Sequence, residues 1–131
     1  MNECGSIFPG AAQGLASIVA MTRPLVDLHL LLSAPPRFHG PVGNTTDGWR
    51  LDDPALLSLE SNVLHQMRTI ETGAGVSTIV FALKRSRHTC VVPDRRVVRR
   101  IRRYCASVEL PLDTVDFVIE QGVRFVTTSA G

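Results

Sequence analysis

The stretch IETGAGVSTIVFAL, residues Ile70 to Leu83, decides the fold because it joins two apolar runs through a turn that contains two glycines. The sequence just before the turn, RTIE, predicts a short strand that ends at the glycines. The residues after the turn, from about Val76 to Lys84, predict a helix. A strand, a glycine turn and a helix are therefore expected in direct succession.

The same alternation continues on both sides of this unit. Before it, DDPALLSLESNVLHQM predicts an amphipathic helix with an acidic cap at Asp53 and a proline at its first position. After it, the sequence predicts a strand at HTCVV and an arginine-rich helix at RRVVRRIRRYCASV. A third strand is predicted at TVDFVI and ends near Glu120. Strands that alternate with helices of this length form βαβ units. We therefore predict an α/β fold, an incomplete Rossmann-like parallel sheet of about three strands with flanking helices.

Residues 1–51 are expected to form an N-terminal helical and loop extension, followed by a partial Rossmann-like domain at residues 52–131. Within the extension, short helices are predicted at Ala11 to Thr22 and at Leu25 to Ser33. The second helix is expected to be buried because it is almost wholly apolar. A loop rich in proline and glycine follows. The apolar stretch Ile7 to Met21 is too short for a membrane span and makes a poor signal peptide, so no membrane role is expected.

The cysteines and histidines indicate neither disulfides nor a metal site. The three cysteines, Cys4, Cys90 and Cys105, are odd in number and lack C-x-x-C spacing. A reducing, cytoplasmic location is the simplest interpretation. His29 and His39 have no second ligand at metal spacing, so no metal is predicted.

Basic residues are concentrated in one part of a chain whose net charge is only +2. Between Lys84 and Arg103 there are nine basic residues and one acid, Asp94. Such a block can bind nucleic acid. However, apolar residues recur there at helical spacing, which places the arginines on the outer face of a helix: Val97, Val98, Ile101, Tyr104, Cys105 and Val108. We interpret the block as a solvated helix face, since the aromatic residues of a nucleic-acid surface are missing.

The glycine turn predicts a ligand site, because ligands of open parallel sheets bind beyond the carboxyl ends of the strands. Gly73 and Gly75 let a ligand approach the main chain, and the start of the next helix offers N–H groups. Glu71 would repel a pyrophosphate there but suits a ligand with an ammonium group. Asp94, after the second strand, can accept hydrogen bonds from ribose hydroxyls. The ligand expected is a nucleoside with a cationic amino-acid tail.

The sequence ETGAG at Glu71 to Gly75, after an apolar strand and before a helix, resembles the first motif of class I S-adenosylmethionine-dependent methyltransferases. The resemblance extends from Asp52 to Val126 and implies S-adenosylmethionine as the cofactor. It implies that Glu71 engages the methionine amino group, that Asp94 binds the ribose, and that the third strand ends near the adenine, around Glu120 and Gln121. The cofactor-binding residues implied in this way are Glu71, Thr72, Gly73, Ala74, Gly75, Ser77 and Asp94.

The resemblance implies a methyltransferase restricted to its cofactor-binding half, because the family fold continues with further strands that carry most acceptor-binding and catalytic groups. We expect little activity from the isolated chain and predict no catalytic residue; His65 and Asp47 are weak candidates for facing an acceptor. The methyl acceptor is not indicated. A homo-oligomer, or packing of the N-terminal helices, is expected to cover the open sheet edge.

Two other functions remain open on the sequence alone. One is a non-catalytic α/β remnant or partner-binding domain. The other is a fragment of an NAD-binding oxidoreductase, which is disfavoured because Thr78 replaces the third glycine of G-x-G-x-x-G and Glu71 is misplaced for a phosphate.

Overall fold

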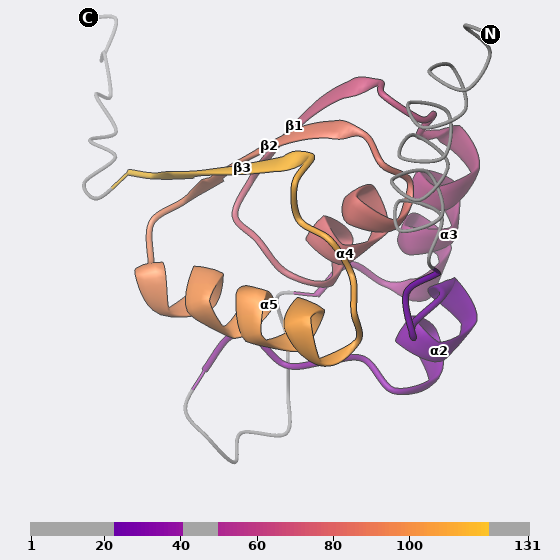
Figure 1. Cartoon of the computed structure of the whole chain (residues 1–131), viewed down its shortest axis with the longest axis horizontal. Coiled ribbons are helices and arrows are strands. Elements are labelled where there is room, and N and C mark those ends of the chain that lie inside the picture. Colours follow the sequence, from indigo (N-terminus) through magenta and orange to yellow (C-terminus); the bar gives the residue numbers. More distant parts are fainter. Residues whose placement is uncertain (1–22, 41–49, 121–131) are drawn as a thin grey trace, which may run out of the picture.

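The computed structural model describes residues 23–40 and 50–120 and confirms the predicted α/β fold (Figure 1). The elements follow in the order α2 (Leu28–Ser33), α3 (Asp53–Asn62), β1 (Arg68–Thr72), α4 (Val76–Leu83), β2 (Arg87–Val92), α5 (Arg95–Ser107) and β3 (Val115–Ile119). The helix predicted at Ala11 to Thr22 lies outside the described residues.

The three strands form one parallel sheet in the order β1-β2-β3. Glu71 of β1 pairs with Cys90 of β2, and Cys90 pairs in turn with Phe117 of β3. Since the strands are parallel, their carboxyl ends lie at one edge of the sheet, where the glycine turn begins (Figure 1). The topology therefore provides the edge at which the sequence predicts a site.

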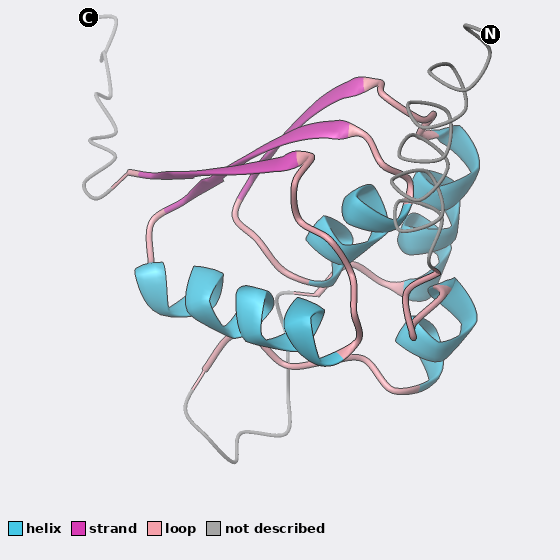
Figure 2. Ribbon diagram, viewed as in Figure 1, coloured by secondary structure: helices cyan, strands magenta, loops and turns pink. Residues whose placement is uncertain are grey.

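The described helices cover one face of the sheet (Figure 2). Side chains alternate between the two faces of each strand, so His88, Cys90 and Val92 of β2 are buried beneath the helices. On the opposite face, Ile70 is 71% exposed and Val118 is 40% exposed. Among residues 23–40 and 50–120 the fold thus has two layers, with the second sheet face bare.

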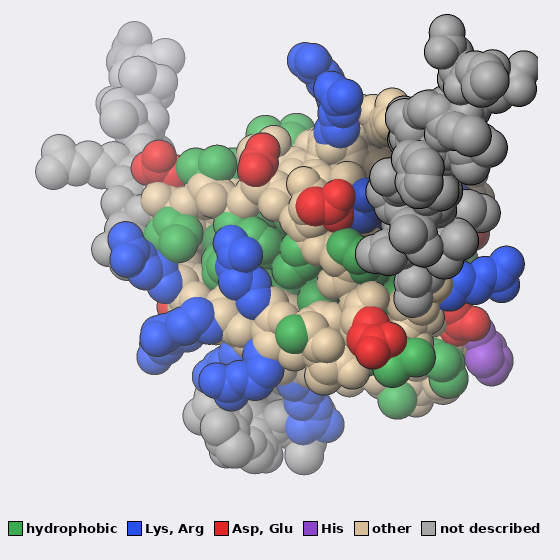
Figure 3. Space-filling model, in the orientation of Figure 1, with side chains coloured by type: hydrophobic (Ala, Val, Ile, Leu, Met, Phe, Trp, Pro, Cys, Tyr) green, Lys and Arg blue, Asp and Glu red, His purple; other side chains and the backbone are tan. Residues whose placement is uncertain are grey.

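A continuous hydrophobic core joins the sheet to α4 and α5. Helix α5 contributes the face predicted from its spacing, with Val97, Val98, Ile101 and Cys105 buried. Most of its arginines lie on the outer surface, where blue side chains follow the helix in Figure 3. The guanidinium carbon of Arg102 lies 5.0 Å from the ring centroid of Phe117. The spacing of apolar residues in the sequence therefore predicted correctly which face of this helix is buried.

The prediction for Leu25 to Ser33 was wrong in extent and in burial. Helix α2 begins only at Leu28, because the Asp27 carboxylate accepts a hydrogen bond from the Leu30 N–H (2.9 Å) and caps the helix. Leu31 is buried, but Leu25 is 62% exposed and Leu30 is 51% exposed. A short helix on the surface of the core buries one stripe of side chains and leaves the others in solvent.

Helix α3 also differs from its prediction at both ends. Its cap is Asp52, whose carboxylate accepts from the Ala55 N–H (3.0 Å), so Pro54 occupies the second helical position. The helix ends at Asn62 rather than near Met67, and Val63 already has an extended backbone. The residues between α3 and Arg68 are needed to turn the chain into β1.

None of the helices in the described part of the chain has both the length and the apolar content needed to span a bilayer. That the chain has no membrane role stays a prediction from the sequence. The cytoplasmic location stays a prediction.

Two isoleucines on opposite sides of the sheet test this arrangement. Ile101 is fully buried in α5, so Ile101→Ala should reduce the free energy of unfolding by about 2–5 kcal/mol through lost burial and a residual cavity. The matched variant Ile70→Ala, on the bare face, should change it by less than about 0.5 kcal/mol. Urea denaturation followed by circular dichroism measures both, and equal losses would contradict a bare second face.

Candidate functional site

The glycine loop, residues 73–75, connects β1 to α4 at the carboxyl edge of the sheet. Gly73 has a φ of +88°, which side-chain-bearing residues rarely adopt, and its N–H donates to the Val91 carbonyl (2.7 Å). Gly75 has an extended φ of 178°, which any residue can adopt. The turn itself therefore requires glycine at position 73 only.

The side chain of Glu71 points to the helix-covered face of the sheet. Its carboxylate accepts hydrogen bonds from Ser77 Oγ (2.7 Å), from Thr78 Oγ1, and from Cys90 Sγ (3.2 Å). Thr78 Oγ1 also accepts from the Gly75 N–H (3.0 Å), which ties the loop to the first turn of α4. The side chain of Glu71 retains 15% exposure. One carboxylate thus joins β1, α4 and β2.

Glu71 stays ionised although it is largely buried. Burial acts to raise the pKa of its carboxyl group, but the polar groups around it, among them the Thr78 and Ser77 hydroxyls and the Cys90 thiol, outweigh burial and hold the pKa below its ordinary value of 4.5. The site therefore carries a negative charge at neutral pH.

His88 is a buried neighbour of Glu71 that the sequence did not single out. Its Nε2 lies 3.1 Å from Glu71 Oε1, and its ring stacks on Phe81 with centroids 3.9 Å apart. The contact lacks hydrogen-bond geometry, and Nε2 has no other partner. At the other side of the ring, Nδ1 lies 2.8 Å from Thr69 Oγ1. The signal for this pairing was the strand alternation, which places His88 and Cys90 on one face.

Cys90 is a neutral thiol in this arrangement. Burial, and then the nearby Glu71 carboxylate, raise the pKa of the Cys90 thiol far above its ordinary value. Its single S–H is shared between the Gly73 carbonyl (3.1 Å) and the Glu71 carboxylate (3.2 Å). The thiol therefore helps to hold the glycine loop in place.

The structure brings the other predicted site residues to the same edge, with different roles. Asp94 caps α5 by accepting from the Arg96 N–H (2.8 Å) and pairs with the Arg96 guanidinium (3.1 Å). These hydrogen bonds from Arg96 lower the pKa of Asp94.

The remaining predicted residues are more scattered. Thr72 is exposed and Ala74 is buried in the loop. Glu120 follows β3, and its N–H donates to the Val92 carbonyl (3.1 Å). Gln121 and Asp47 lie outside the described residues, and His65 is exposed on the segment before β1.

A segment from the N-terminal part of the chain lies against the glycine loop, which sequence reasoning missed. His39 Nε2 donates to the Ala74 carbonyl (2.5 Å), and a Cβ placed on Gly75 would lie 3.6 Å from the same nitrogen. Arg100 of α5 holds this segment by donating to the carbonyls of Phe38 (2.8 Å) and Gly40 (3.1 Å). The view of all α5 arginines as solvated was therefore wrong for Arg100.

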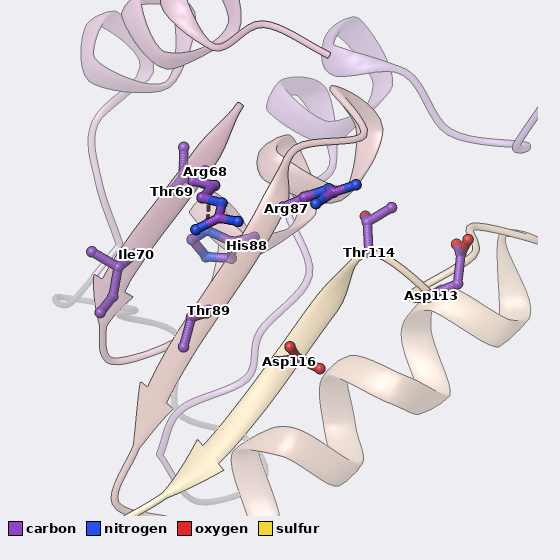
Figure 4. A pocket seen from close by; sticks show the side chains of 9 residues that line it. All are labelled: Arg68, Thr69, Ile70, Arg87, His88, Thr89, Asp113, Thr114 and Asp116. Carbon is purple, nitrogen blue, oxygen red and sulfur yellow. Dashed lines mark hydrogen bonds between the residues drawn. The ribbon is translucent and has the colours of Figure 1, made fainter. Parts of the chain in front are cut away.

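A hollow of about 630 Å³ lies elsewhere on the sheet, at the amino-terminal ends of the strands (Figure 4). Its lining comes from all three strands and the turn before β3: Arg68, Thr69, Ile70, Arg87, His88, Thr89, Asp113, Thr114 and Asp116. The glycine loop is not part of this lining, so the hollow and the loop are separate features.

Comparison with known proteins adds no family to this description. No protein-family model, curated protein or solved structure matches the chain. The geometry of the loop and the residues around Glu71 are therefore the features from which a function can be inferred.

The two loop glycines should respond differently to alanine. Gly73→Ala should cost about 1–2 kcal/mol of stability, because its positive φ strains a residue with a Cβ. Gly75→Ala should cost less than Gly73→Ala, because its backbone is extended and the new Cβ would make only an ordinary contact. Thermal and urea unfolding measure both variants, and the reverse order would contradict the loop geometry.

Glu71 should contribute a pH-dependent part of the stability. Its pKa is lower in the folded chain than in the unfolded chain, so its contribution is complete above the ordinary value near 4.5 and is lost as the pH falls through the folded pKa. Between about pH 5 and pH 3 the wild type should therefore lose more stability than Glu71→Gln. Urea unfolding across this range measures the difference, and parallel profiles would argue against an ionised Glu71.

Proposed function

We propose that the chain binds S-adenosylmethionine as the cofactor-binding half of a class I methyltransferase. The observation that carries the proposal is the convergence of an ionised carboxylate and a turn containing two glycines at the carboxyl edge of a parallel sheet. Ligands of open α/β sheets bind at that edge. A glycine with a positive φ leaves main chain without a side chain beside the charge of Glu71.

Each part of the edge suits one part of such a cofactor. The partly exposed carboxylate of Glu71 would attract the methionine ammonium group, and the start of α4 favours the methionine carboxylate. Asp94 would accept from the ribose hydroxyls, exchanging contacts now made with Arg96. The end of β3, near Ile119 and Glu120, is the expected place of the adenine. The chain's contribution is to bind and align the donor, because methyl transfer from a sulfonium depends chiefly on positioning.

One observation favours the alternative, an α/β domain that binds no cofactor. Both oxygens of Glu71 already accept hydrogen bonds from within the chain. In that case the carboxylate serves to hold β1, α4 and β2 together, and an ammonium group would have to compete with these donors. The two functions differ in whether the folded chain binds the cofactor.

Calorimetry with S-adenosylhomocysteine and with NAD, in the presence of a chelator, tests the proposal. We expect binding of S-adenosylhomocysteine and no binding of NAD, because Glu71 attracts an ammonium and repels a pyrophosphate. Glu71→Gln and Asp94→Asn should each weaken binding about tenfold or more, through the loss of a charge-assisted hydrogen bond. Asp113→Asn is the matched control and should leave binding unchanged, since Asp113 pairs with Arg85 at the other end of the sheet. A folded chain that binds no S-adenosylhomocysteine would support the non-binding alternative.

A further inference from the structure

Three side chains that commonly bind metals gather under the first turn of α4. The ligand atoms of Glu71, His88 and Cys90 all lie within 4.8 Å of one another. Glu71 Oε1 is 3.1 Å from His88 Nε2 and 3.2 Å from Cys90 Sγ. The strand register explains the cluster, because Glu71 pairs with Cys90 and His88 lies two residues before Cys90 on the same face. The cluster is thus built on strands, which hold side chains precisely.

A chain of hydrogen bonds determines that Nδ1 of His88, the nitrogen away from Glu71, carries a proton. Ser86 Oγ donates to the Phe81 carbonyl (3.3 Å), which can only accept. Thr69 Oγ1 donates its proton to Ser86 (3.1 Å), so it must accept from His88 Nδ1 (2.8 Å). Nδ1 therefore carries a proton, and Nε2 is the nitrogen that faces Glu71.

Nε2 lacks a hydrogen-bond partner in a position where that is costly. His88 is 1% exposed, so no bulk water reaches the nitrogen, and the nearby Oε1 is not in line for an N–H donor. A buried lone pair facing a carboxylate is repulsive, and a buried polar atom without a hydrogen-bond partner destabilises the fold. A cation bound by Nε2, the carboxylate and the sulfur removes both the repulsion and the unpaired nitrogen.

We propose that Glu71, His88 and Cys90 bind a divalent transition-metal ion of the zinc class. Imidazole nitrogen with thiolate sulfur selects such ions over magnesium or calcium, which prefer oxygen ligands. Ligand atoms held about 2.0–2.3 Å from a tetrahedral zinc ion are roughly 3.3–3.8 Å apart. The observed 3.1 and 3.2 Å are within a few tenths of an ångström of that range, so a small opening of the cluster accommodates the ion.

The neighbours of the cluster complete the site. The Gly73 carbonyl oxygen, 3.1 Å from Cys90 Sγ, is placed to act as a fourth ligand, with water as the other choice. Thr69 Oγ1 accepts a hydrogen bond from the Nδ1–H of His88. Histidines that bind a metal through one nitrogen usually donate such a hydrogen bond from the other nitrogen. On binding, the Cys90 thiol releases its proton to solvent and its sulfur becomes a thiolate ligand. No oxidation or reduction is involved.

Cobalt(II) titration of the purified full-length chain tests the site. In a Cys4→Ala, Cys105→Ala background, Cys90 is the single remaining thiol. We expect one equivalent of cobalt to produce a thiolate-to-cobalt charge-transfer band in the near ultraviolet and intense tetrahedral bands in the visible, both removed by zinc. Adding Cys90→Ser should abolish the charge-transfer band, whereas the exposed-histidine variant His65→Ala should retain it. Persistence of the band after Cys90→Ser would overturn the proposal.

A variant outside the metal ligands keeps the test independent of folding defects. Thr69→Val removes the hydrogen bond to His88 Nδ1 and should weaken cobalt binding about 10- to 100-fold, and Thr69→Ser should restore it. Circular dichroism checks that each variant is folded. The alternative is that a proton, and not a metal ion, lies between His88 Nε2 and the Glu71 carboxylate. In that case the folded chain will show no thiolate band, and nitrogen NMR will show His88 protonated at both nitrogens. This result would overturn the proposal. The titration contains no cofactor, so its outcome is separate from that of the calorimetry.

Discussion

The carboxylate of Glu71 is the point on which the structure of the site depends. It is largely buried yet ionised, and a buried charge is tolerated only where donors surround it. The donors come from two elements: Ser77 and Thr78 begin α4, and Cys90 belongs to β2. Through these hydrogen bonds the carboxylate joins β1, the first turn of α4 and β2, and Thr78 in turn holds the glycine loop.

Much of the fold could be predicted because it depends on local patterns. The apolar spacing of Val97 to Cys105 and the glycines after RTIE indicated helix, strand and turn without tertiary information. The neighbours of the Glu71 side chain could not be predicted, since they depend on the register between β1 and β2. For the same reason His88 was not recognised as its neighbour. The contact of His39 with the loop joins residues far apart in the sequence, and local patterns carry no information about it.

Glu71 also connects the two proposals, because one carboxylate can neutralise only one cation at a time. The ammonium group of the cofactor would approach the exposed part of the side chain, and a metal ion would lie on the side of His88 and Cys90. Two positive charges within a few ångströms repel each other by several kcal/mol at the effective dielectric of a protein surface. The cofactor and the metal are therefore expected to compete, although each site is assembled from different neighbours of Glu71.

The order of the strands bears on how the chain reaches this structure. Each pair of neighbouring strands is consecutive in the sequence, with a single helix between the two strands. The described sheet can thus grow in the direction in which the ribosome delivers it, and no pairing has to wait for a distant segment. All the described side chains that donate to Glu71 lie on α4 and β2, so the cluster can form without any contribution from β3.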